Sequence, residues 1–297
     1  MTGADGVSAA VVNYNAKRHL LDCLRSLRSE GISDIVVADN ASVDGSEVAV
    51  RAAEPDVIYV QTGANLGMGT GTNRAVAHTD VSTPFLLCLN PDARLERGAL
   101  EAMLAAFDDR PDLGIVGPRI EDPDGTLYPS VRTFPKLVDA VGHAYLGMVW
   151  GANPFTRRYR MLDWNHDTAG DVDWVSGSCF VIRRTCWDAI SGFDEGYFMY
   201  AEDVDLCWRA RRAGWEVTYE PSAVAVHVQG VSTDRHPYRM IAEHHRALLR
   251  FATRSSRGPE RLLLPLMAVG LLVRTPLAWL HRLLAGRRRV DPKSVVH

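Results

Sequence analysis

VSAAVVNYNAKRHLLDCLRSLRSEGISDIVVADN, residues 7–40, places a helical pattern between two short β-branched runs. The runs are 7–13 and 35–39, and the helical pattern covers 17–28. A strand, a helix and a second strand in succession are typical of a parallel sheet with helices on its faces. The segment therefore predicts an α/β fold.

The same alternation continues to residue 107. We expect further strands at 57–61 and 85–90, and further helices at 46–53, 69–78 and 98–107. Ligands of such sheets bind outside the carboxyl ends of the strands. Asn13, Asp39 and Asn90 fall at strand ends, so the pattern predicts that these three polar side chains meet on one edge.

The second half is less regular. Pro and Gly residues predict irregular structure from about 120 to 170. Beyond it we expect strands at 173–182, 217–219 and 224–228, and helices at 184–190 and 202–213, the last ended by Gly214. From 235 onward the pattern is helical, which divides the chain into a domain of residues 1–234 and an extension of 235–297.

Charge and cysteine content indicate the cellular compartment of the protein and the character of its two parts. Residues 235–297 carry 13 Lys and Arg against 3 Asp and Glu, while the preceding residues carry 20 against 33. The five cysteines are scattered and contain no CxxC pair, which favours reduced thiols in the cytoplasm over a disulfide framework. The polar N-terminus lacks the segments of a secretory signal. We therefore expect an acidic cytoplasmic body with a basic C-terminal extension.

The extension contains an apolar run of 12 residues, 262–273. This run is too short to span a bilayer, which takes about 20 residues. The neighbouring Arg274, Pro276 and the arginines at 287–289 suit a segment that lies in the membrane interface beside anionic lipids. The alternative is a helical hairpin packed on the body or on a second subunit.

Residues 192–205, GFDEGYFMYAEDVD, combine acids and aromatics before a helix. Aromatic rings can cover a sugar face, and exclusion of water preserves the basicity of a carboxylate. Glu202, Asp203 and Asp205 are therefore candidates for a general base. The alternative is that they are ordinary acids at a helix N-terminus.

Two motifs suggest a nucleotide ligand. Asp39 follows a strand and can accept a hydrogen bond from a pyrimidine imide N–H, whereas Asp44 and Glu47 have the spacing of a helix capping box. The glycine-rich segment from Asn65 to Asn73 allows close backbone approach and offers N–H groups to phosphate. The first strand leads directly into Asn13-Tyr14-Asn15, without the glycines of a dinucleotide-binding turn, so a nicotinamide cofactor is disfavoured.

Asp92 in the sequence Asn90-Pro91-Asp92 supplies a carboxylate at the sheet edge. One carboxylate together with substrate phosphates is a usual way to hold Mg²⁺ or Mn²⁺. His227, at the end of an expected strand, is a second candidate ligand, although a lone strand histidine is more often a core residue.

In order along the chain, these motifs resemble those of the family 2 glycosyltransferases, an inverting family of the GT-A fold, and within it the bacterial rhamnosyltransferases. The matching pieces also include Ser176-Gly177-Ser178 and Gly192-Phe193-Asp194-Glu195, and the set covers residues 7–230. The resemblance implies a mostly parallel sheet flanked by helices, with a membrane-associating C-terminal segment.

The resemblance also implies roles for individual residues. The general base would be Asp203, with Glu202 as the second choice, and the ligands of Mg²⁺ or Mn²⁺ would be Asp92 and His227. Asp39 would contact the thymine of the donor. The residues that would hold the donor are Asn13, Asp39, Asn65, Gly67, Asn73 and Asn90. Asn90 stands where many members carry Asp, which reduces the number of carboxylates at the metal.

The substrates implied are a dTDP-rhamnose donor and a polyprenyl-diphosphate-linked N-acetylglucosamine acceptor, used for a cell-wall linker at the inner face of the cell membrane. No nucleic acid is expected, and a homo-oligomer is left open. The alternatives are transfer of galactofuranose or glucose to another lipid or polysaccharide, and a nucleotide-sugar-binding protein without catalysis.

Overall fold

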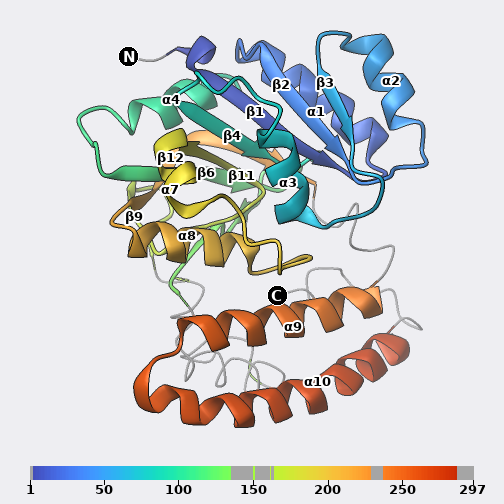
Figure 1. Ribbon diagram of the computed structural model, residues 1–297, viewed down its shortest axis with the longest axis vertical. Helices are drawn as coiled ribbons and strands as arrows, with labels where there is room; N and C mark the ends of the chain where they lie inside the picture. Colours follow the sequence, from blue (N-terminus) through green and yellow to red (C-terminus); the bar gives the residue numbers. More distant parts are fainter. Residues whose placement is uncertain (1–2, 135–149, 151–160, 162–163, 229–236, 286–297) are drawn as a thin grey trace.

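The computed structural model describes residues 3–134, 150, 161, 164–228 and 237–285. A central sheet lies between helices, and two long C-terminal helices lie below it (Figure 1). The strands are β1 (Val7–Asn13), β2 (Asp34–Asp39), β3 (Ile58–Gln61), β4 (Phe85–Leu89), β5 (Ala93–Leu95), β6 (Leu113–Glu121), β7 (Leu127–Tyr128), β8 (Val131–Arg132), β9 (Gly170–Asp171), β10 (Trp174–Val175), β11 (Cys179–Arg183) and β12 (Glu216–His227). The helices are α1 (Lys17–Ser29), α2 (Ser46–Ala53), α3 (Met68–Val76), α4 (Ala99–Ala105), α7 (Arg184–Ile190), α8 (Glu202–Arg212), α9 (Pro237–Ser255) and α10 (Leu264–Ala285), with 3-10 turns at Ala4–Gly6 and Gly258–Leu263.

The main sheet has the order β3-β2-β1-β4-β11-β6-β12-β5. Its first four strands are parallel, as expected. The other half is more mixed than expected, because β11 runs antiparallel to both β4 and β6, and β5 runs antiparallel to β12. An antiparallel β11 begins at the edge where β4 ends, which brings the turn before β11 to the carboxyl ends of the parallel strands.

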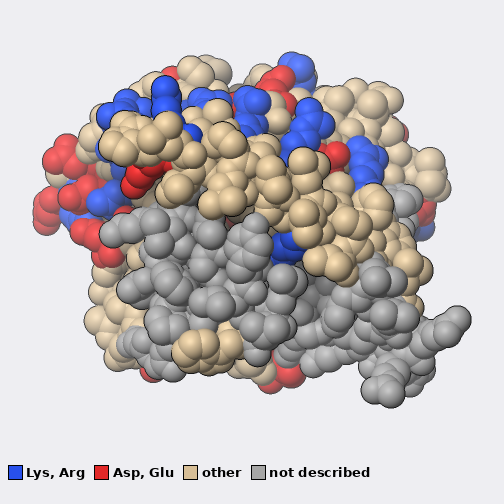
Figure 2. All heavy atoms as spheres, turned by 90° about the horizontal axis from the view of Figure 1, so that it is seen from below, with Lys and Arg blue, Asp and Glu red and all other residues tan. Residues whose placement is uncertain are grey.

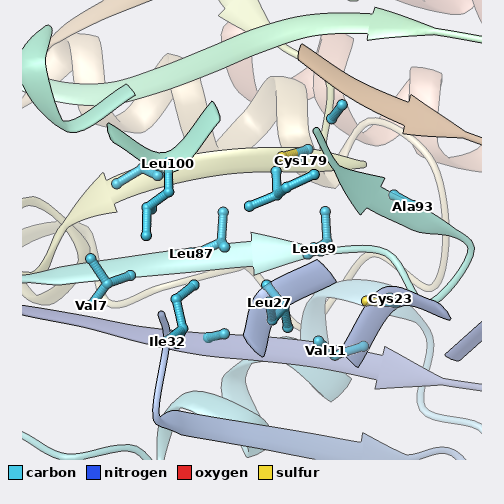
Figure 3. Close-up of a cluster of buried hydrophobic side chains, with 14 of the residues drawn as sticks. Val7, Val11, Cys23, Leu27, Ile32, Leu87, Leu89, Ala93, Leu100 and Cys179 are labelled. Carbon is cyan, nitrogen blue, oxygen red and sulfur yellow. The ribbon is translucent and has the colours of Figure 1, made fainter. Parts of the chain in front are cut away.

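Helices cover both faces of the sheet, which places one apolar cluster on each side. One cluster joins the strands to α1 and α4. In Figure 3, residues of β1 (Val7 and Val11) and β4 (Leu87 and Leu89) form a single layer with Cys23 and Leu27 of α1 and Leu100 of α4. The second cluster joins the opposite face to α3, α7 and α8, and it includes Ala247 and Phe251 of α9. Helix α9 therefore contributes to the core of the body.

Helix α10 packs on α9 through a small cluster of Ala252, Met267 and Leu271. His245 and Thr275 form a 2.7 Å hydrogen bond, and the Trp279 indole donates to the Tyr238 carbonyl oxygen at 3.1 Å. The segment Gly258–Trp279 has 22 residues and contains an 18-residue window with a mean hydropathy of 1.7, so by length and composition alone it could cross a membrane. The 12-residue apolar run thus lies within a longer apolar segment, and its placement in the membrane interface stays a prediction.

Most expected helices and strands are confirmed, but several regions differ, and the short strands β5, β7 and β8 were not expected. The strand expected at 173–182 is broken at residues 176–178, and the two expected last strands form one strand, β12, with a register shift between Glu220 and Val224. Strand β6 was missed because Gly114, Gly117 and Pro118 interrupt its apolar pattern. These glycines are needed for packing, since a Cβ on Gly117 would lie 2.6 Å from Val175 Cβ.

Candidate active site

Three polar side chains lie in register at the carboxyl ends of β1, β2 and β3. Asn13 pairs with Asp39 and Asp39 pairs with Gln61 in the strand register. The Asp39 carboxylate accepts hydrogen bonds from Asn13 Nδ2 at 3.0 Å and Gln61 Nε2 at 2.9 Å, and a third from the Ser42 hydroxyl. The parallel strands thus bring Asn13 and Asp39 together as the sequence predicted.

Asp39 is fixed by these donors and is only 1% exposed. The Ser42 N–H also donates to Asp39 Oδ2 at 3.3 Å, so four protein donors occupy the about four acceptor sites of the ionised carboxylate, and a ligand N–H would have to share an oxygen with one of them. Whether Asp39 contacts a nucleobase stays a prediction.

Asp44 has a structural role, but not the expected capping box. Its carboxylate accepts from the backbone N–H of Lys17 at 2.9 Å and that of Ser46 at 3.1 Å, linking the starts of α1 and α2. Gly45 is the N-cap of α2, and Glu47 pairs with Arg51 and Gln61 instead of reaching back.

The glycine-rich turn before α3 approaches another part of the chain. Gly67 has φ +85°, and a Cβ there would lie 1.9 Å from the carbonyl oxygen of Phe198. The Met68 N–H donates to that oxygen at 3.1 Å, and Asn65 Oδ1 accepts from the Gly67 N–H at 3.1 Å. Gly67 is therefore required where the turn meets residues 191–201, here named the α7–α8 loop.

Asn73 also holds the α7–α8 loop. Its amide donates to the Phe193 carbonyl at 2.9 Å and accepts from the Phe193 N–H at 2.9 Å. A third contact reaches Glu195 at 3.3 Å. The structure thus gives Asn73 a structural role, and its role and those of Asn65 and Gly67 in donor binding stay predictions.

Asn90, Asp92 and His227 come together at the ends of β4 and β12. The His227 Nε2 atom lies 3.2 Å from Asp92 Oδ1 and 3.4 Å from Asn90 Nδ2. The contact depends on β5, which directly follows Asp92 and pairs Ala93 with His227. The side chains of Asp92 and His227 are 9% and 14% exposed.

This group fits a hydrated divalent cation. Asn90 Oδ1 and His227 Nδ1 are buried without a protein hydrogen-bond partner. Among the described residues, no group of three or more His, Cys, Asp or Glu side chains gathers as a metal cage. A carboxylate, an imidazole and an amide oxygen match an ion that keeps several waters and takes its other ligands from substrate phosphates.

Glu202 and Asp203 begin α8 at the same edge of the sheet. Asp203 Oδ2 accepts from the Gly177 N–H at 2.9 Å, and Oδ1 accepts from the Val204 N–H at 2.8 Å. The next residue, Ser178, accepts through its carbonyl oxygen from the Asn90 N–H at 2.9 Å. The turn at 176–178 therefore connects Asp203 directly with the Asn90 group.

Burial shifts the titration of both acids. It raises the pKa of Glu202 to about 8, with a further rise from the charge of Asp203. Burial also raises the pKa of Asp203, and the hydrogen bond from Gly177 opposes this rise. Glu202 is 7% exposed and its Oε2 atom has no partner, whereas Asp203 is partly exposed. Asp203 is therefore the better placed of the two to reach an acceptor hydroxyl.

Asp205, the third candidate for a base, does not fit that role. It is fully buried, and its carboxylate lies 2.6 Å from Arg209 Nε and 3.5 Å from Arg254 Nε. Tyr197 donates a further hydrogen bond at 3.4 Å. A carboxylate enclosed in this way is a structural ion-pair partner, so this candidate is rejected.

Two parts of the site were not found by reasoning from residue patterns. The Gly177 N–H, which holds Asp203, belongs to the expected strand 173–182, and only the resemblance pointed to Ser176-Gly177-Ser178. The contacts of Arg250 and Arg254 with Asp194 join segments far apart in the chain. Their only signal was the spacing of arginines along the expected C-terminal helix.

A separate hollow of about 400 Å³ is lined by residues that include Arg119, Asp167 and Glu220. It contains no predicted site residue. Arg119 pairs internally with Glu121 at 2.7 Å and with Asp167 at 2.8 Å, so its charge is already balanced.

Comparison of the sequence with known proteins gives consistent matches. A family model described as "Glycosyltransferase like family 2" matches residues 4–248. The N-acetylglucosaminyl-diphospho-decaprenol L-rhamnosyltransferase of Mycobacterium tuberculosis H37Rv is 39% identical over 254 residues, which are 82% of this chain and 82% of that protein. The rhamnosyltransferase WbbL of Escherichia coli K12 is 29% identical over 225 residues, 73% of this chain and 81% of that protein.

Solved structures share the fold. The mannosyltransferase PcManGT from Pyrobaculum calidifontis, in complex with GDP-Man and Mn²⁺, has a TM-score of 0.58 and 17% identity, and the match covers 97% of this chain and 76% of that one. GalNAc-T7 with UDP, GalNAc and Mn²⁺ has a TM-score of 0.56 and 14% identity, with 76% and 43% covered. The expected GT-A fold class is confirmed.

Proposed function

The chain belongs to glycosyltransferase family 2, and on this premise we propose that it transfers L-rhamnose from dTDP-β-L-rhamnose to a polyprenyl-diphosphate-linked N-acetylglucosamine. The observation that carries the choice of substrates is the 39% identity, over 82% of both chains, with the mycobacterial rhamnosyltransferase. The reaction would serve cell-wall linker synthesis.

The donor is proposed to lie along the carboxyl ends of β1, β2 and β4. Asp39, fixed by Asn13, would accept from the imide N–H of thymine. The turn at Asn65 and Gly67 would border the diphosphate, and Asn90 would lie at its far end. Support comes from the strand register, which aligns Asn13 with Asp39 and places Asn90 at the end of the neighbouring β4.

Asp92 and His227 are the residues proposed to hold Mg²⁺ or Mn²⁺, with the Asn90 carbonyl oxygen beside them. When bound, such an ion supplies charge neutralisation to the departing dTDP. The chain contributes a carboxylate and an imidazole held 3.2 Å apart by the β5–β12 pairing. The buried, unpartnered Asn90 Oδ1 atom is the observation that supports a ligand at this point.

Asp203 is proposed as the general base that removes the proton from the acceptor hydroxyl. Both of its oxygens are held by backbone N–H groups, which orient the carboxylate and favour its ionised form. Glu202 is proposed to lie behind it as a buried, largely protonated neighbour. A single displacement by the activated hydroxyl would invert the anomeric centre and give an α-rhamnoside.

The acceptor carries a long lipid, so the enzyme must work at a membrane surface. The outward side of α10 and of the 3-10 turn before it exposes Leu262, Leu266, Val269, Leu272 and Val273. Figure 2, which views the molecule from the α10 side, shows a band of uncharged atoms bordered by a row of Lys and Arg side chains. This combination suits an anionic lipid surface at the inner face of the cell membrane. We propose that residues 1–234 form the transferase domain and that 235–297 dock it there.

The test is product analysis with a set of donors. The enzyme is incubated with N-acetylglucosaminyl-diphosphoryl-decaprenol and, in separate reactions, with dTDP-rhamnose, UDP-galactofuranose and UDP-glucose. We expect a lipid product heavier by one deoxyhexose with dTDP-rhamnose alone. A hexose product with either UDP donor would change the assigned sugar, and absence of any transfer would favour a binding protein without catalysis.

A further inference from the structure

Two arginines join α9 to the α7–α8 loop and to α8, and in Figure 1 α9 lies directly below α8. Arg250 Nη2 donates to both carboxylate oxygens of Asp194, at 2.9 and 3.0 Å. Arg254 pairs with the same carboxylate and also with Asp205. The side chain of Asp194 is 16% exposed and that of Asp205 is fully buried, whereas those of Arg250 and Arg254 are 40% and 37% exposed, so the ion pairs are shielded on the carboxylate side.

The packing around these ion pairs is close. The Arg250 guanidinium lies 5.1 Å from the centre of the Tyr197 ring, and a Cβ on Gly196 would lie 2.0 Å from Arg250 Nη2. Arg239 lies over the Phe198 ring at 4.5 Å. The α7–α8 loop is thus enclosed between α9 on one side and the turn at Gly67 on the other.

The end of the loop has a backbone conformation that needs such support. Tyr200 and Ala201 have φ of +69° and +58°, in the left-handed region that non-glycine residues rarely adopt. Conformations of this kind persist where the surrounding structure fixes them, and they occur often at active sites. Glu202 and Asp203 follow immediately, so the direction in which α8 starts depends on this loop.

We propose that Arg250 and Arg254 are positioning residues of the transferase: through Asp194 and Asp205 they fix the α7–α8 loop and the first turn of α8. The Asp203 carboxylate is thereby held at the sheet edge. This positioning role rests on the proposed function. It gives α9 two tasks, to support α10 and to help position the catalytic carboxylate.

Removal of one ion pair should lower turnover more than donor binding. In Arg250→Gln and Arg254→Gln we expect kcat to fall roughly 10- to 100-fold, because misplacing a reacting group by about 1 Å costs up to about 10²-fold. The dissociation constant for dTDP-rhamnose should rise by a smaller factor than kcat falls, since Asn13 and Asp39 at the proposed thymine site are held by their own hydrogen bond and strand pairing. Arg250→Lys, which keeps the charge, should restore part of the loss.

The partner carboxylate gives a second, independent readout. If Arg250 acts through Asp194, the double variant Arg250→Gln with Asp194→Asn should turn over no more slowly than Arg250→Gln alone. Arg246→Gln, a change at an exposed arginine of the same helix, is the matched control and should behave as wild type.

Amide hydrogen exchange provides a measurement that needs no substrate. We expect residues 194–206 to exchange at least tenfold faster in Arg250→Gln than in wild type, while α1 is unchanged. Wild-type kcat in both glutamine variants, or unchanged exchange in this segment, would overturn the positioning role. Equal losses of kcat and donor affinity, with a lowered melting temperature and no rescue by lysine, would overturn the proposal and show that the arginines only stabilise the fold. Absence of rhamnosyl transfer by the wild type would count against the proposed function alone, because exchange still decides the positioning role.

Discussion

The backbone N–H of Gly177 donates a 2.9 Å hydrogen bond to Oδ2 of Asp203 across 26 residues of sequence. The two residues are in close contact, since a Cβ on Gly177 would lie 3.1 Å from Asp203 Cβ. Gly177 sits in the turn between β10 and β11, and that turn also binds the Asn90 backbone. One short turn therefore sets the place of the proposed base relative to the proposed metal ligands.

Gly177→Ala should slow catalysis without unfolding the protein. The added methyl group must push Asp203 by a few tenths of an ångström, which we expect to lower kcat roughly tenfold by misalignment. Steady-state kinetics check this, with Gly170→Ala as control, because a Cβ there would make an ordinary 3.4 Å contact with Trp164. A kcat equal to that of the control would show that the Gly177 contact does not position the base.

Asp203→Asn should abolish most turnover while leaving dTDP-rhamnose binding intact. The amide cannot accept the acceptor proton, and loss of a general base typically costs about 10²- to 10⁴-fold. Calorimetry of donor binding together with steady-state kinetics measures both effects. Near-normal turnover would reject Asp203 as the base.

Glu202→Gln should change how stability depends on pH. The folded pKa of Glu202, about 8, lies above its ordinary value of 4.5. Between these pH values Glu202 keeps its proton in the folded protein but is ionised in the unfolded chain. The free energy of unfolding of the wild type therefore falls as pH rises, by up to about 1.4 kcal/mol per pH unit. Glutamine cannot ionise, so the variant should show a smaller fall.

Urea unfolding across this pH window measures the difference. Glu101→Gln, at an exposed glutamate of α4, is the control and should follow the wild type. Parallel curves for wild type and Glu202→Gln would contradict the raised pKa.

Divalent metal removal should stop transfer, and changes at the proposed ligands should weaken the affinity for the metal. A chelator should abolish turnover of the wild type. Asp92→Asn and His227→Gln should each raise the half-saturating Mn²⁺ concentration by at least roughly tenfold, the lower end of losses at metal sites. The measurement is turnover against metal concentration, with the exposed Asp108→Asn as control. Full activity in the chelator would contradict a metal-assisted reaction.

The exposed leucines of α10 and of the 3-10 turn before it should be needed for lipid binding. Leu262, Leu266 and Leu272 are 82%, 57% and 73% exposed, and their combined change to Ser should reduce binding to anionic vesicles. Sedimentation with vesicles tests this. Val48, Val81 and Ile58 are exposed elsewhere, so their combined change to Ser is the control. Equal vesicle binding by the two triple variants would favour a docking surface for another subunit.

The sequence predicted the first half of the fold well because its signals are local. Each of β1 to β4 is a continuous apolar run, and each following helix has its own pattern, so the edge with Asn13 and Asp39 could be derived before the structure. The pattern also pointed to Glu202 and Asp203, because acids and aromatics stand next to each other in the chain.

The remaining features depend on contacts between distant segments, which leave no periodic signal. The neighbourhood of Asp92 and His227 requires the pairing of β5 with β12, and the roles of Gly67 and Asn73 require the α7–α8 loop to lie beside α3. Asp205 resembles Asp203 in the sequence. Only the placement of Arg209 and Arg254 separates a buried ion-pair partner from a candidate base.

Transfer itself provides the most direct test of the central claim. Wild type and Asp203→Asn are incubated with dTDP-β-L-rhamnose, Mn²⁺ and N-acetylglucosaminyl-diphosphoryl-decaprenol, and the lipid products are analysed by mass spectrometry and NMR. We predict an α-linked rhamnosyl product from the wild type and nearly none from the variant. A β-linked product, or equal product from both proteins, would contradict an inverting transfer that depends on Asp203.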